Sequence, residues 1–158
     1  MADTAKHVAP PQLSARDKSY LDRYYKPVCD QAKIFGVDPA FVLGIAFESG
    51  FASEGTYLVT GDAFGMTGGS TKHMTRASSP ADNVRQFFDN WGSQVRGSGI
   101  NVQEFVNALQ GQDLAGLRVK GWKVYNTENF DKWKRGVTDG IRLMQRDIRI
   151  YNSQSKNK

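Results

Sequence analysis

The least polar stretch of this chain is the feature that most constrains its fold. Residues 41–47 read Phe-Val-Leu-Gly-Ile-Ala-Phe, and Glu48 follows them directly. Asp38 and Pro39 precede this stretch as the N-cap and first-turn pair that commonly opens a helix. A helix without a polar face has to be buried. We therefore predict a buried helix that opens at Pro39 and ends with a carboxylic acid.

The position of Glu48 suggests a chemical role for its side chain. Burial makes an ionised carboxylate costly, and the negative end of the helix dipole acts in the same direction. We expect both effects to raise the pKa of Glu48, so that the acid stays protonated near neutral pH. A neutral acid can donate a proton, as glycosidases require. The alternative is an ordinary side chain that turns into solvent where the helix ends.

Helical spacing of apolar residues dominates the rest of the chain. Four further helices are predicted from apolar residues that recur at steps of three and four. These helices follow the cap residues Ser14, Ser79, Asn101 and Thr127. The last apolar stripe runs from Phe130 to Tyr151. Another short helix is predicted over residues 113–119, and Pro27 is expected to kink the first helix.

Residues 54–76 differ in character from the helical segments. Glycine is frequent there, and the run Tyr-Leu-Val-Thr at residues 57–60 lies among the glycines. This pattern is typical of an irregular segment with short strands or a hairpin. The predicted fold class is therefore α+β and predominantly helical, with a small β-region after the helix that ends at Glu48.

The length of the chain, 158 residues, suits one domain with its own core. We place this domain at residues 13–151, between an N-terminal tail at 1–12, predicted to be disordered, and a basic C-terminal tail at 152–158. Residues 1–12 lack the apolar core of a secretory signal peptide, and no run of about 18 apolar residues is present. We therefore expect synthesis in the cytoplasm without a signal peptide, and no integral membrane segment.

Composition gives no indication of a metal or cofactor. The chain has one cysteine, Cys29, and two histidines, and none of them falls in a metal-ligand spacing. A single cysteine also excludes an intramolecular disulfide. We expect no metal site and no cofactor.

Positive charge is concentrated near the C-terminus. Residues 118–158 contain 11 basic and 4 acidic side chains, whereas residues 1–117 contain 10 basic and 12 acidic side chains. A basic end could contact nucleic acid, an anionic membrane or an anionic cell-wall polymer, and the alternative is a solvated helix face. A nucleic-acid-binding helical protein is one rival interpretation. Because the chain has no recognisable helix-turn-helix or zinc motif, we expect no nucleic-acid partner.

Three short stretches resemble motifs of the lysozyme-like superfamily and occur in the order expected for it. Residues 48–51, Glu-Ser-Gly-Phe, resemble the Glu-Ser-Gly-aromatic motif of lytic transglycosylases and bacterial glucosaminidases. Residues 63–68, Ala-Phe-Gly-Met-Thr-Gly, are similar to the Phe-Gly-Ile-Lys/Thr-Gly segment of the glucosaminidases and to the Gly-Leu-Met-Gln segment of transglycosylases and goose-type lysozymes. Residues 125–130, Tyr-Asn-Thr-Glu-Asn-Phe, resemble the glucosaminidase Tyr-Ala-Thr-Asp-Pro-Asn-Tyr stretch, and the first two fit the transglycosylase Ala-Tyr-Asn-Ala-Gly motif. Thr67 replaces the transglycosylase Gln and Asn126 replaces the glucosaminidase Ala, so the chain resembles a divergent member.

This resemblance implies a lysozyme-like fold and a substrate, the glycan strand of peptidoglycan, whose β-1,4 bonds between MurNAc and GlcNAc are cut. It implies that Glu48 is the proton donor and that Tyr125 lies near that acid or lines the sugar site. The alternative for Tyr125 is a core tyrosine at a helix start. The residues expected at the sugar site are Ser49, Phe64, Gly65, Met66 and Asn126.

A second carboxylate is needed only by some enzymes of this kind. An inverting hydrolase places one about 6.5–9.5 Å from the acid, and a retaining hydrolase places a nucleophile about 5 Å away. Asp62 and Glu54 are the candidates, and Asp62 is preferred because it precedes the Phe64-Gly65 motif. Both could instead be ordinary loop acids. A lytic transglycosylase needs no second carboxylate, because the substrate's own 6-hydroxyl attacks.

The same sequence is compatible with a module that holds glycan without cutting it. An enzyme of this kind without a signal peptide would act on the cell wall, in the periplasm, after delivery as a phage lysis protein or as an effector of a secretion machine. Its expected partners are peptidoglycan strands and either an immunity protein or the delivery machinery.

Overall fold

The computed structural model of this chain describes residues 12–48, 61–66, 76–99 and 101–156, and at residues 47, 48, 155 and 156 it describes the backbone. The helices of this part are α1 (Ala15–Phe35), α2 (Pro39–Glu48), α4 (Pro80–Val95), α5 (Val102–Leu109) and α6 (Phe130–Lys156). Among the described residues there is no strand, and one isolated antiparallel bridge joins Gln112 to Arg118. The prediction of a predominantly helical chain is confirmed. Most of the predicted β-region lies outside the described residues.

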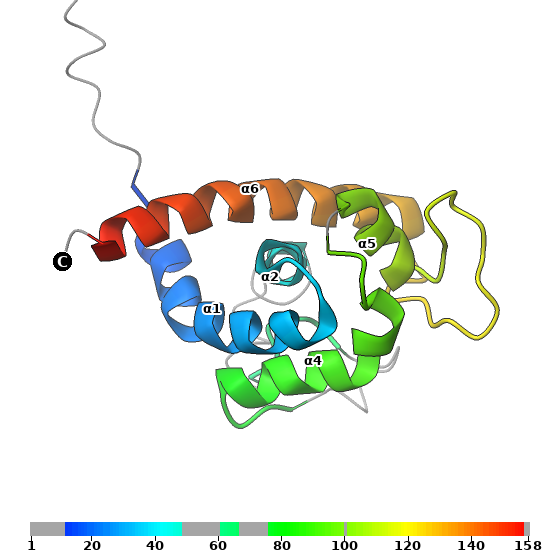
Figure 1. The fold of residues 1–158 in the computed structure, drawn as a ribbon, viewed down its shortest axis with the longest axis horizontal. Coiled ribbons are helices and arrows are strands. Elements are labelled where there is room, and N and C mark those ends of the chain that lie inside the picture. The colour runs from blue at the N-terminus through cyan, green and yellow to red at the C-terminus, as the bar shows by residue number, and fades with distance from the viewer. Residues whose placement is uncertain (1–11, 49–60, 67–75, 100, 157–158) are drawn as a thin grey trace, which may run out of the picture.

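Helix α2 lies at the centre of the molecule. In Figure 1 the view runs nearly along its axis, and the other helices surround it. All side chains from Phe41 to Ala46 are buried, which confirms the predicted burial of this part of the helix. The predicted cap is also present, because the backbone N–H of Ala40 donates to Oδ1 of Asp38 at 2.8 Å. Glu48 is the last residue of α2.

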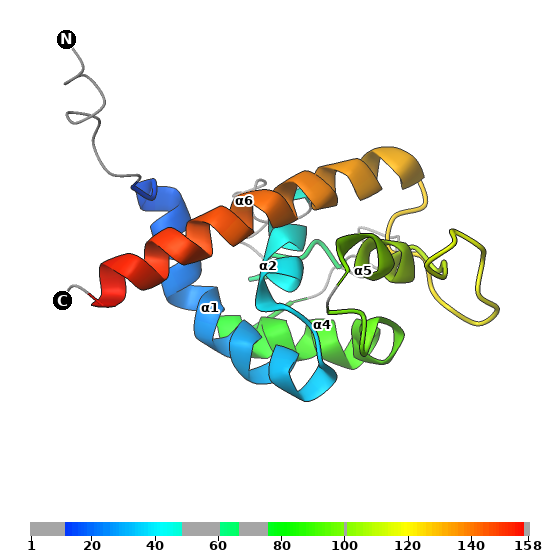
Figure 2. The ribbon, with the colours of Figure 1, turned by 45° about the horizontal axis from the view of Figure 1, so that its top comes forward.

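The longest helix, α6, crosses α2 in near contact with its backbone, and Figure 2 shows the crossing from a second direction. A Cβ atom added to Gly44 would lie 2.6 Å from the backbone nitrogen of Ile141. Glycine at this position therefore permits an approach that any side chain would prevent. The predicted inward stripe of α6 is buried at Trp133, Val137, Ile141 and Met144. None of the helices in the described part of the chain has the length and apolar character of a membrane span.

Helix α1 begins and ends as its sequence predicts. The side chain of Ser14 accepts a hydrogen bond from the backbone N–H of Asp17 at 3.0 Å, and Gly36 ends the helix with φ +68°. Pro27 lies within the helix without ending it.

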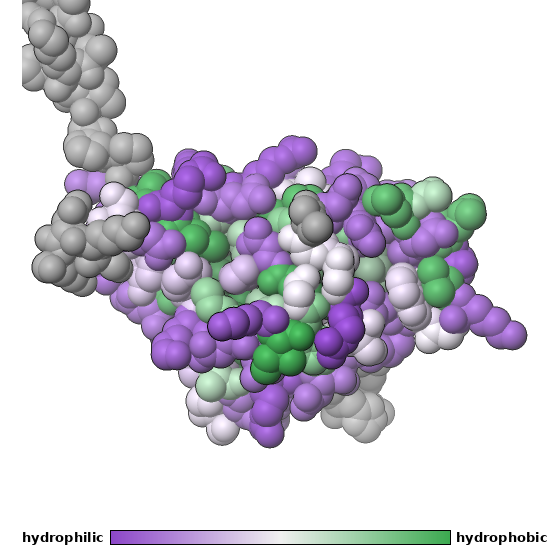
Figure 3. Space-filling view, in the orientation of Figure 1, coloured by the Kyte–Doolittle hydropathy of each residue, from purple (hydrophilic) through white to green (hydrophobic). Residues whose placement is uncertain are grey.

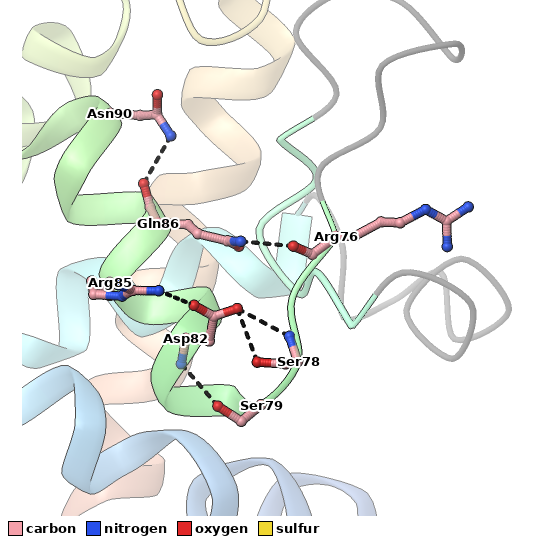
Figure 4. A network of polar contacts seen from close by, with 7 residues as sticks. All are labelled: Arg76, Ser78, Ser79, Asp82, Arg85, Gln86 and Asn90. Carbon is pink, nitrogen blue, oxygen red and sulfur yellow. Dashed lines mark hydrogen bonds and ion pairs between the residues drawn. The ribbon is translucent and has the colours of Figure 1, made fainter.

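The start of α4 is fixed by a group of polar contacts on the chain that leads into it, which Figure 4 shows from close by. The side chain of Ser79 accepts from the backbone N–H of Asp82 at 3.0 Å, and the Asp82 carboxylate accepts from the backbone N–H of Ser78 at 3.0 Å. One turn further on, Gln86 donates to the carbonyl oxygen of Arg76 at 2.7 Å. These reciprocal bonds tie residues 76–79 to the first two turns of α4.

Two local predictions were wrong. Residues 113–119 form turns instead of a short helix, because Asp113 bonds Leu117 twice, through its own backbone N–H and through its carboxylate. The final helix begins at Phe130 and not after Thr127. The side chain of Asn126 accepts from the backbone N–H of Asn129 at 2.8 Å, which holds the intervening residues in a turn ahead of the helix.

We expect Gly44→Ala to destabilise the fold strongly, because the added methyl would collide with the backbone of α6. The expected loss in the free energy of unfolding is about 2–4 kcal/mol, measured by chemical denaturation. The matched control is Gly97→Ala, where an added Cβ meets nothing within 4 Å and only the φ of +77° is unfavourable. Gly97→Ala is expected to lower the free energy of unfolding by about 1 kcal/mol. Equal losses at both positions would contradict the close crossing of α2 and α6.

A buried acid on α6 gives the stability a pH dependence. Asp147 is 1% exposed, and its Oδ1 atom lies 3.1 Å from Nη2 of Arg146. Desolvation raises the pKa of Asp147, and the carboxyl group of Asp17 adds to the effect. The folded state favours the protonated acid. The contribution of Asp147 to the free energy of unfolding is therefore most favourable below the ordinary pKa of an aspartate. It is lost as the pH rises through the raised pKa.

Asp147→Asn is therefore expected to raise the free energy of unfolding at neutral pH, and this gain is expected to fade on acidification. The measurement is a series of urea denaturations across the acid range. Asp139→Asn on the exposed side of the same helix is the control, since Asp139 makes only a surface ion pair with Arg142 at 3.6 Å. A gain for Asp147→Asn that does not change with pH would contradict this account.

Candidate functional site

Residues 61–66, which include the described part of the second motif, pack between α1 and α4. The ring of Phe64 is fully buried, with its centroid 6.0 Å from that of Tyr24 on α1 and 5.1 Å from that of Phe87 on α4. The side chain of Phe64, predicted at the sugar site, is therefore a core side chain. Gly65, at φ +66°, is the half-exposed residue of the same motif, and Met66 is buried.

Asp62, the preferred candidate for a second carboxylate, is buried and bonded within the protein. It is 4% exposed. Its Oδ1 atom accepts from the backbone N–H of Phe64 at 3.0 Å and from the side chain of Asn83 at 2.9 Å. Its Oδ2 atom accepts from the backbone N–H of Met66 at 2.6 Å. The carboxylate thus closes the tight turn that shapes the motif.

Asn83, which sequence reasoning missed, connects three parts of the fold. Its side chain is fully buried on α4. Its Oδ1 atom accepts from the hydroxyl of Tyr24 on α1 at 2.8 Å and from the backbone N–H of Ala63 at 2.9 Å, while its amide donates to Asp62. A signal was present in the sequence, because an amide on the apolar face of a predicted helix needs buried partners.

Tyr125, from the third motif, reaches back to the second one. Its hydroxyl donates to the carbonyl oxygen of Phe64, across 61 positions of sequence. Its ring lies between two indoles, with centroids 4.8 Å from Trp91 and 4.9 Å from Trp133. Desolvation raises the pKa of Tyr125 well above its usual value, and the carboxylate of Asp62 adds to this. The phenol is therefore a neutral hydrogen-bond donor across the physiological pH range.

Residues 125–126 are held in place by the end of α5. The backbone N–H of Tyr125 donates to the carbonyl oxygen of Leu109 at 2.9 Å. The buried side chain of Gln110 bonds the backbone of Asn126 twice, donating to its carbonyl oxygen at 2.9 Å and accepting from its N–H at 2.9 Å. The side chain of Asn126 is used locally, in the turn before α6. Gln110 is a second positioning residue that sequence reasoning missed.

The middle of α2 is linked to this assembly through two tyrosines. The hydroxyl of Tyr20 donates to the carbonyl oxygen of Leu43 at 2.8 Å, and its ring lies 5.3 Å from that of Tyr24. Tyr24 in turn contacts Phe64 and Asn83. The side chain of Glu48, together with residues Ser49 and Glu54, lies outside the described residues. The structure thus brings the second and third motifs together, and the two tyrosines connect them to the helix that ends at Glu48.

One hollow in the described part of the chain lies apart from these residues. A shallow hollow of about 430 Å³ lies over α5 and α6, lined by Gln103, Asp131, Lys134, Arg135, Thr138, Asp139 and Arg142. Within the described part of the chain, no group of three His, Cys, Asp or Glu side chains could hold a metal ion.

No family model, curated protein sequence or solved structure matches this chain.

We expect Asn83→Ala to destabilise the fold, because it leaves the Ala63 N–H and the Tyr24 hydroxyl without their buried acceptor. The expected loss is about 2–4 kcal/mol in the free energy of unfolding. Asn90→Ala on the exposed side of the same helix is the matched control, expected to change stability by about 0.5 kcal/mol or less. Similar effects of the two substitutions would show that the polar cluster does not hold residues 61–66.

Proposed function

We propose that this protein is a glycosidase of the lysozyme-like type that cleaves the β-1,4 glycosidic bonds of the peptidoglycan glycan strand, with Glu48 as the general acid. The observation that supports this most is the convergence of the motifs. Tyr125 of the third motif bonds Phe64 of the second, and Phe64 is connected through the rings of Tyr24 and Tyr20 to the buried helix that ends at Glu48. The proposal includes a small β-region within residues 54–76.

The environment of α2 supports an acid that donates a proton. The helix is buried along its described side chains, and the negative end of its dipole lies at Glu48. Both features disfavour the ionised form of a carboxyl group held at that end. A protonated Glu48 would transfer its proton to the glycosidic oxygen as the bond from that oxygen to the sugar C1 breaks.

The bonding of Asp62 favours a mechanism with one carboxylate. Both of its oxygens accept hydrogen bonds from the protein, and the group is almost fully buried. A group so placed can neither attack the sugar nor activate a water without breaking the turn that it closes. We therefore propose the chemistry of a lytic transglycosylase. The substrate's own 6-hydroxyl attacks C1 and passes its proton to the Glu48 carboxylate, which restores the acid and leaves a 1,6-anhydro sugar.

The remaining site residues then have defined tasks. Asp62 and Asn83 position the turn at residues 61–66, and Tyr125 fixes that turn through the Phe64 carbonyl. Gly65, half-exposed and without a side chain, would let the glycan approach the backbone closely. Asn126, half-exposed on the adjacent segment, would line the same sugar site.

Glu48→Gln is expected to retain the fold and to abolish release of soluble fragments from purified peptidoglycan, because an amide cannot donate the required proton. The measurement is the absorbance of released muropeptides, with circular dichroism as the check on folding. A folded Glu48→Gln protein with full activity would overturn the proposal. Glycan binding by the wild-type protein without any release would favour a non-catalytic module instead.

Asp62→Asn and Glu54→Gln test the one-carboxylate mechanism. Asp62→Asn is expected to lower the free energy of unfolding by about 1–3 kcal/mol, since an amide offers one acceptor where the carboxylate offers two. The rate per folded molecule is expected to fall by less than about tenfold, as for a positioning residue. Glu54→Gln is expected to leave activity near the wild-type level. A fall of about a thousandfold in the rate per folded molecule of either variant would identify a second catalytic carboxylate.

A further inference from the structure

Two exposed leucines stand close together on the loop between α5 and α6. Four large hydrophobic side chains are exposed in the described part of the chain: Ile34 (62%), Leu114 (54%), Leu117 (66%) and Leu143 (43%). Leu114 and Leu117 lie three positions apart in residues 110–129, which we call the α5–α6 loop. This loop projects beyond the helices (Figures 1 and 2). Hydrophobic side chains are visible at the same end of the molecule in Figure 3.

The backbone around these leucines is bonded within the loop. The backbone N–H of Asp113 donates to the carbonyl oxygen of Leu117 at 2.8 Å, and the N–H of Leu117 donates to the Asp113 carboxylate at 2.9 Å. The side chain of Gln112 donates to the carbonyl oxygen of Gly116 at 2.9 Å, and that of Asn107 to the carbonyl oxygen of Asp113 at 3.1 Å. Polar backbone groups that are already paired lose little when water is removed from them.

Arg118 bonds three carbonyl oxygens of the loop. Its guanidinium donates to the carbonyl oxygens of Gly111 at 3.0 Å, Val119 at 2.8 Å and Trp122 at 2.6 Å. The chain around the leucines is therefore held in one arrangement by many bonds, with both apolar side chains directed outward. A surface that is already ordered loses less conformational entropy when it binds.

The α5–α6 loop and the start of α6 are basic overall. Residues 110–135 contain six basic and three acidic side chains, and Asp113 is the acid beside Leu114. The basic ones are Arg118, Lys120, Lys123, Lys132, Lys134 and Arg135. Lys120 is exposed and lies three positions after Leu117. Apolar side chains beside a basic surface match the interface of an anionic bilayer, where acyl chains lie beneath negative headgroups.

We propose that the α5–α6 loop docks this protein onto an anionic lipid surface, with Leu114 and Leu117 entering the interfacial layer. The exposed Lys120, three positions after Leu117, then contacts the headgroups. Tyr125 belongs to the same loop, so docking would hold the candidate site near the membrane. The proposal does not depend on the proposed glycosidase activity, because binding to lipid is measured without peptidoglycan.

The test is co-sedimentation of the full chain with vesicles of phosphatidylglycerol and phosphatidylcholine, compared with vesicles of phosphatidylcholine alone. Binding is expected with the anionic vesicles and is expected to weaken as salt rises from about 0.05 M to about 0.5 M. The double substitution Leu114→Ser and Leu117→Ser is expected to weaken binding on the order of tenfold or more.

A matched control removes the other two exposed apolar side chains, with the double substitution Ile34→Ser and Leu143→Ser. It is expected to bind as the wild-type protein does. Lys120→Gln is expected to weaken binding more than Lys33→Gln, which makes the same change of charge on α1. Equal weakening by the two serine pairs, equal binding to neutral vesicles, or no binding by the wild-type protein would each overturn the proposal.

Discussion

The absence of a polar face on α2 is the constraint on which the rest of the structure depends. Side chains from Phe41 to Ala46 point in every direction around the helix, and all of them are buried. Such a helix cannot lie on a surface, so the other helices have to cover it on all sides. Gly44 lets α6 cross at backbone contact, and the hydroxyl of Tyr20 on α1 bonds a carbonyl oxygen of α2. Glu48 is the last residue of this enclosed helix.

Buried amides and one buried carboxylate set the geometry around that point. Asn83 joins α4 to α1 and to residues 61–66, and Gln110 joins α5 to residues 125–126. An unpaired polar group in a core costs more than a made bond gains, so each of these side chains strongly favours one arrangement of its partners. Tyr125 then closes the assembly through the carbonyl oxygen of Phe64. The motifs are thus held together by polar contacts that an apolar core alone would not specify.

Local patterns predicted most of the helices and several of their ends. The cap at Ser14 and the burial of α2 depend on neighbouring residues, and both are confirmed. Contacts between distant segments could not be predicted from such local patterns. Nothing near Asp62 in sequence indicates that Asn83 and the turn to Met66 surround its carboxylate. An acidic residue beside glycines is typical of an exposed loop. The prediction of a helix over residues 113–119 was wrong for a related reason. Their apolar spacing fitted a helix, but the side chain of Asp113 favoured a turn.

The central claim is that a single acid at the end of the buried helix performs the chemistry. The most direct test is mass spectrometry of the soluble products that the wild-type protein releases from purified peptidoglycan. Products that end in 1,6-anhydro-muramic acid are predicted, because the substrate's own hydroxyl replaces water in a one-carboxylate mechanism. Products with hydrated reducing ends would contradict the claim, since hydrolysis requires a second group to activate water or to attack the sugar.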